Sequence, residues 1–93
     1  MQLRYHHECW PPIWSKIDGP GPAVLDDEYA TLNTVYLSQI DPPTTCYLSV
    51  RSGTTTYMGT ILCTDPDFCR QICRLLQTFE GKTLSEIANV NLP

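Results

Sequence analysis

Residues 46–63, with the sequence CYLSVRSGTTTYMGTILC, decide the fold class of this chain. Apolar and polar side chains alternate along both halves of this stretch, which is typical of strands that bury one face. The pair Ser52-Gly53 separates the two halves and predicts a tight turn, so the stretch is expected to form a β-hairpin. With Ser52-Gly53 as the loop, Arg51 is placed opposite Thr54.

The same alternation sorts the side chains of the hairpin into two faces. The face expected to be buried collects Cys46, Leu48, Val50, Tyr57, Gly59, Ile61 and Cys63. The face expected to point outward collects Tyr47, Ser49, Arg51, Thr54, Thr56, Met58, Thr60 and Leu62. A register slip of one residue would mix these sets, so burial favours a register that keeps them apart.

Further elements are predicted on both sides of the hairpin. The run 31–40 is rich in β-branched and aromatic residues and stops at an Asp-Pro-Pro sequence, which predicts another strand. Asp65 and Pro66 suit the cap and first position of a helix that is expected to stop at Gly81. A T-x-x-E capping box at 83–86 predicts a short second helix. The apolar stripe of the longer helix comprises Phe68, Ile72, Leu75, Leu76 and Phe79, with Cys69 and Cys73 at its border.

The beginning of the chain has a different character. Pro11-Pro12 forces an extended conformation on the residue before it, and a Gly-Pro-Gly-Pro run at 19–22 leaves no room for regular structure. Residues 1–30 are therefore predicted to be an irregular arm rich in Pro and Trp, with one helical turn around 13–17. The whole chain is expected to be a single α+β domain, 1–93. In it, a three-stranded antiparallel meander (31–63) is packed on one face by a helical segment (65–93).

Composition narrows the class of protein. The 93 residues carry a net charge of −4, and 42% of them are hydrophobic, which favours a folded domain and disfavours general attraction to phosphate backbones or anionic lipid. No stretch approaches the length of a membrane span. The five cysteines are an odd number, and no apolar signal region accompanies them, so they are expected to be reduced thiols in a cytoplasmic protein.

These patterns favour binding over catalysis. The sequence contains no phosphate-cradling glycine loop, no G-x-S-x-G and no H-E-x-x-H, and no set of residues converges on catalytic chemistry. We expect a small non-enzymatic interaction or regulatory protein without a cofactor, which binds a protein partner, foremost a second copy of itself. The sheet residues expected to make that contact are Tyr47, Met58 and Leu62.

Two pairs of residues outside the sheet are further contact candidates. Trp10 and Trp14 flank the two prolines of the arm, where they either pack across the core or form an exposed patch for a partner. Arg70 and Arg74 lie one turn apart on the predicted helix and are candidates for a polar partner. Two arginines on an acidic protein provide little positive charge for binding nucleic acid, which is therefore not an expected partner.

Two alternatives remain open at this stage. A metal- or redox-responsive module would use His6, His7, Cys9, Cys69 and Cys73, with zinc as the expected metal. The chain has no C-x2-C pair, so the spacing is weak evidence for such a site. The acidic cluster at 26–28, together with the net charge, would suit an inhibitor that occupies the basic site of a nucleic-acid-binding protein.

Overall fold

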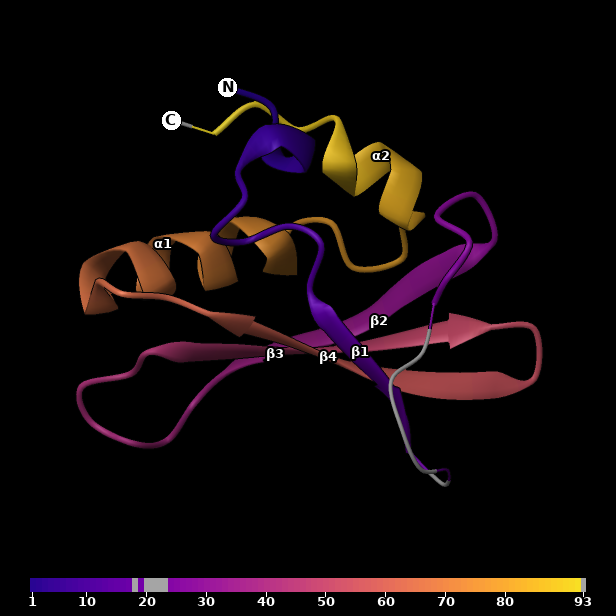
Figure 1. The fold of residues 1–93 in the computed structure, drawn as a ribbon, viewed down its shortest axis with the longest axis horizontal. Coiled ribbons are helices and arrows are strands. Elements are labelled where there is room, and N and C mark those ends of the chain that lie inside the picture. Colours follow the sequence, from indigo (N-terminus) through magenta and orange to yellow (C-terminus); the bar gives the residue numbers. More distant parts are fainter. Residues whose placement is uncertain (18, 20–23, 93) are drawn as a thin grey trace.

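An antiparallel sheet carries all of the helical segments on one side, and the structure describes no helix on its other side (Figure 1). The computed structural model describes residues 1–17, 19 and 24–92. The elements in chain order are η1 (Leu3–Tyr5), β1 (Ile13–Lys16), β2 (Ala30–Leu37), β3 (Thr45–Ser52), β4 (Thr55–Leu62), α1 (Pro66–Gln77) and α2 (Leu84–Ala88). This is the predicted α+β class. No described helix is long and apolar enough to cross a membrane.

The sheet has four strands in the order β1-β4-β3-β2, so the prediction of a three-stranded meander was wrong by one strand. The additional strand, β1, comes from the segment predicted to be an irregular arm, and it pairs antiparallel with β4, Ile13 lying opposite Thr60. Residues 13–17 contain two isoleucines and a tryptophan, which favour a strand, but no partner strand lies close to them in the sequence. The helical turn expected there is absent because pairing with the distant β4 satisfies the backbone instead. The Gly-Pro run at 19–22 lies largely outside the described residues.

The β3-β4 hairpin forms with a register two residues away from the predicted one. Ser52 pairs with Thr55, so Gly53 and Thr54 form the loop. Gly53 has a φ of 63°, which suits the first loop position of a type II′ turn. Because the shift is an even number of residues, every side chain within β3 and β4 stays on its predicted face, whereas Thr54, predicted to face outward from the strand, lies in the loop. The predicted division of the hairpin into two faces is therefore confirmed.

Strand β2 is shorter than predicted and contains an irregularity that the sequence pattern hides. It ends at Leu37 instead of residue 40, and its register with β3 shifts between Leu32 and Thr34. A bulge at this point inserts one residue into the alternation. Leu32 and Val35 are both buried as a result, although an odd number of positions separates them.

The helices begin at the predicted caps. The Asp65 carboxylate accepts a hydrogen bond from the Asp67 backbone N–H at 3.0 Å, and the Thr83 hydroxyl accepts one from the Glu86 N–H at 3.3 Å. Helix α1 ends at Gln77, earlier than predicted. The buried residues of α1 are Cys69, Ile72, Cys73 and Leu76, while Phe68, Leu75 and Phe79 are only partly buried. The two cysteines thus belong to the buried face of the helix.

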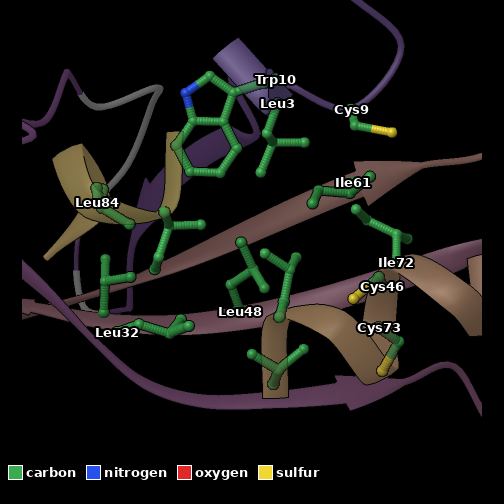
Figure 2. Packing of buried hydrophobic residues seen from close by; sticks show 14 of the residues in the cluster. Leu3, Cys9, Trp10, Leu32, Cys46, Leu48, Ile61, Ile72, Cys73 and Leu84 are labelled. Carbon is green, nitrogen blue, oxygen red and sulfur yellow. The ribbon is translucent and has the colours of Figure 1, made fainter. Parts of the chain in front are cut away.

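The core lies between the sheet and the helical layer. Figure 2 shows Leu48 and Ile61 of the sheet with Ile72 and Cys73 of α1 in one cluster, and Leu3 on the helical side of the sheet. Helix α1 packs against β2 and β3, and α2 packs against β2. This arrangement covers one face of the sheet and leaves the opposite face without a helical layer.

Candidate interaction surface

The side chains that point away from the helices form a surface that we call the uncovered face. Alternation along the paired strands places one set of residues on it, and every strand contributes. The set comprises Ile13 and Ser15 of β1, Thr31, Thr34 and Tyr36 of β2, Tyr47, Ser49 and Arg51 of β3, and Thr56, Met58, Thr60 and Leu62 of β4.

Aromatic side chains and a thioether organise the centre of the uncovered face. The rings of Tyr36 and Tyr47 stack with their centroids 5.2 Å apart and their planes 23° apart. The Tyr36 hydroxyl donates a weak hydrogen bond to the Met58 sulfur at 3.7 Å. These contacts run across three neighbouring strands, because Tyr36 pairs with Tyr47 in one ladder and Met58 lies on the next strand. These contacts link the three side chains across the centre of the face.

The uncovered face exposes more apolar surface than its hydroxyl-rich composition suggests. Ile13 is 61% exposed, Leu62 is 57% exposed and Tyr36 is 45% exposed. Arg51 is the only charged side chain that the four strands contribute to this face. Isolated apolar side chains are normal on a surface, whereas several on one flat face with almost no charge are typical of a contact region.

The three sheet residues predicted as contacts all lie on the uncovered face, where Tyr47 and Met58 are partly buried and Leu62 is exposed. Sequence reasoning missed Ile13 and Tyr36. Ile13 lies in the segment predicted to be irregular, and the bulge in β2 disguises the alternation that places Tyr36 outward. The run Ile-Trp-Ser-Lys-Ile after the two prolines was the available signal for an additional strand.

The two tryptophans are buried, which corrects their assignment to an exposed contact patch. Trp10 is 6% exposed and Trp14 is 7% exposed. Trp14 lies over Gly59, its partner in the β1-β4 ladder, and a Cβ at Gly59 would overlap the six-membered ring of the indole. Packing across the core, the other interpretation open at the sequence level, is the one that the structure supports.

The two helix arginines lie on the helical side of the molecule, away from the uncovered face. Arg70 contacts Asp67 at 3.2 Å and Asp41 at 3.9 Å, and all three side chains are substantially exposed. Arg74 is exposed near the end of α1. The structure therefore does not join either arginine to the sheet contacts, and the exposed ion pairs of Arg70 contribute little to stability.

The residues of the alternative metal site are not arranged around a common point. His6 stacks on Phe68 with ring centroids 5.2 Å apart, and its Nδ1 is buried without a hydrogen-bond partner. His7 is exposed, whereas Cys9, Cys69 and Cys73 are buried. Among the described residues, no group of three or more His, Cys, Asp or Glu side chains is placed to hold a metal ion.

The thiols lie in an environment that disfavours their ionised form. All five cysteines are buried and free. Burial raises the pKa of Cys9 to about 11 and the pKa of Cys63 to about 12. Burial also raises the pKa values of Cys46 and Cys73. The thiolate is the reactive species in metal binding and thiol exchange, so these four side chains behave as small apolar core residues near neutral pH.

No protein-family model matches this chain, and no curated protein or solved structure is similar to it.

Proposed function

We propose that this chain is a non-enzymatic interaction protein that acts in the cytoplasm as a homodimer, with the uncovered faces of two copies packed together. The observation that carries the proposal is the exposure of Ile13, Tyr36 and Leu62 on one sheet face that no described helix covers. Burying such side chains against another apolar surface stabilises an assembly by roughly 25 cal/mol for each Å² removed from water.

A second copy suits this face because the face is nearly neutral. The protein carries a net charge of −4, so two copies repel each other in general. The uncovered face contributes only Arg51 to the charge balance, so two such faces can approach without bringing rows of like charges together. A two-fold dimer uses the same patch on both copies, and flat sheet faces pack about 10 Å apart in known architectures.

The cytoplasmic assignment is supported by the free thiols. Cysteines persist unpaired in reducing compartments, and the five of this chain are free and buried in its core. Raised thiol pKa values do not favour the metal- or redox-responsive alternative, since reactive thiols lie in environments that lower the pKa.

The proposal is tested by the mass of the protein in solution, measured by light scattering after size exclusion. Leu62→Glu places a carboxylate in the proposed contact, and Gln71→Glu makes the same charge change on the exposed side of α1. We expect Leu62→Glu to lower the mass observed at a given concentration and to weaken association through the uncovered face by at least tenfold, about 1.4 kcal/mol. Gln71→Glu is expected to leave the mass unchanged. Equal masses for the wild type and Leu62→Glu would overturn the proposal.

A further inference from the structure

The sheet has two edges, and the structure closes one of them. Along the outer edge of β2, the Leu32 N–H donates to the Lys82 carbonyl at 2.9 Å, and the Leu32 carbonyl accepts from the Gly81 N–H at 2.7 Å. Further along, the Val35 N–H donates to the Glu80 carboxylate at 3.0 Å. The segment after α1 therefore occupies the backbone groups that another strand would need.

The other edge, formed by β1, is not closed in this way. The Ile17 N–H donates to the Thr56 carbonyl at 3.4 Å. Because antiparallel ladders alternate, the backbone groups of Ile13, Ser15 and Ile17 face β4, and those of Trp14 and Lys16 face outward. Within the described ranges, these outward groups have no hydrogen-bond partner. Helices α1 and α2 pack against β2 and β3, on the other half of the sheet.

The side chains of this edge are apolar on the same side as the uncovered face. Ile13 is 61% exposed and Ile17 is 55% exposed. Pro11-Pro12 precedes the strand and cannot donate backbone hydrogen bonds, so the available edge begins at Ile13. An open edge flanked by β-branched apolar residues is a template for an additional strand.

We propose that the outer edge of β1 is a second self-association site, where β1 of another copy pairs antiparallel about a two-fold axis at Ser15. In this register, Trp14 lies opposite Lys16 of the second copy, and the outward N–H and C=O groups of both residues are satisfied. Ile13 lies opposite Ile17 of the second copy and shields it from water. The two lysines do not face each other, so the edge is complementary to itself.

This inference goes beyond the proposed function, because it assigns a contact that does not use the uncovered face and through which face-to-face dimers associate into larger assemblies. Variants that each disrupt only one contact distinguish the contact through the uncovered face from the contact through the β1 edge. Lys16→Pro removes an outward N–H without removing a ladder hydrogen bond to β4, so the fold tolerates it while strand addition is blocked. Lys16→Gln removes the charge and keeps the backbone, and is the matched control.

The experiment measures the mass of Leu62→Glu, alone and combined with each substitution at Lys16, by light scattering over a range of concentrations. We expect Leu62→Glu to remain a dimer through the edge, Leu62→Glu with Lys16→Pro to be a monomer, and Leu62→Glu with Lys16→Gln to remain a dimer. A monomeric Leu62→Glu, or a dimer that Lys16→Pro leaves intact, overturns the edge contact. The proposed function fails separately, when Leu62→Glu matches the mass of the wild type.

A second measurement keeps the test independent of how well Lys16→Pro folds. Amide hydrogen exchange of Leu62→Glu reports directly on the Trp14 and Lys16 N–H groups. We expect their exchange to slow at least tenfold as the concentration rises through the dimerisation range, while the amide of Arg74 within α1, which packs on the other half of the sheet, stays unaffected as an internal reference. Exchange that is independent of concentration at both amides overturns the inference.

Discussion

The two faces of the sheet are made by the same strands and differ in what lies over them. Leu48, Val50 and Ile61 point toward the helices and are buried almost completely. Tyr47, Ser49 and Arg51, which alternate with them along β3, point the other way and stay partly or fully exposed. Alternation thus decides which face a residue occupies, and the helical layer decides which face is buried.

The covered face also has the tighter geometry. Trp14 fills the space above Gly59 so closely that even one additional methyl group would overlap its ring. The uncovered face has stacked tyrosines and hydroxyl groups that neighbouring copies can approach. We therefore expect substitutions on the covered face to act on folding, and those on the uncovered face to act on the proposed association.

A matched pair of leucines gives the largest expected difference. Leu48→Ala removes a side chain that is 1% exposed and leaves a cavity, which should lower the free energy of unfolding by about 2–5 kcal/mol. Leu62→Ala removes one that is 57% exposed, and should cost less than about 1 kcal/mol at protein concentrations low enough to keep copies apart. Urea denaturation measures both values. Similar losses would show that the two faces are not energetically distinct.

The contact between Trp14 and Gly59 gives the second largest expected change in the free energy of unfolding. Gly59→Ala is expected to lower the free energy of unfolding by about 1–3 kcal/mol, because the added methyl group overlaps the indole. Trp14→Leu removes the obstructing ring, so Gly59→Ala should cost less in that background. A double-mutant cycle by chemical denaturation measures the coupling. A coupling energy near zero would contradict the close approach.

The closed edge of β2 provides a smaller effect. Glu80→Ala leaves the Val35 N–H without its carboxylate partner, and should cost about 1–2 kcal/mol of the free energy of unfolding. Glu28→Ala is the control, since this exposed side chain lies outside the helices and strands and makes no hydrogen bond among those the structure describes. Thermal unfolding followed by circular dichroism compares the two variants. If Glu80→Ala unfolds at the same temperature as the wild type, the β2 edge is closed by the backbone groups of Gly81 and Lys82 alone.

The smallest effect near neutral pH comes from the buried thiols of the core. Burial raises the pKa of Cys9 from about 9 to about 11 and the pKa of Cys63 to about 12, so the native state holds these protons where the unfolded state releases them. The contribution of these two thiols to the free energy of unfolding is therefore complete below about pH 9. It is lost as the pH rises from about 9 to about 12. Denaturation at a series of pH values should show this fall. The free energy of unfolding of Cys63→Ala should fall less steeply with pH than that of the wild type. An identical slope for the two proteins would contradict a raised pKa for Cys63.

The sequence alone was sufficient for the elements whose signals are local. The helix caps at Asp65 and Thr83 depend on hydrogen bonds within a few residues, and both form as predicted. The hairpin faces depend only on alternation, and they survive a register error of two residues because the period is two.

The elements that were missed depend on distant partners. Strand β1 forms because β4, more than forty residues further along the chain, is available to pair with it. The burial of Trp10 and Trp14 likewise depends on where the first segment crosses the core. Of the candidate contact surface, Tyr47, Met58 and Leu62 could be placed on one face in advance, whereas Ile13 and Tyr36 required the strand pairing and the bulge to be known.

Sedimentation equilibrium of the wild-type protein tests the central claim most directly, because it measures mass without any substitution. If the uncovered face pairs with itself, the average mass rises with concentration to at least twice that of one chain. A single-chain mass of 10.5 kDa that stays constant up to millimolar concentration would contradict self-association through either the face or the edge.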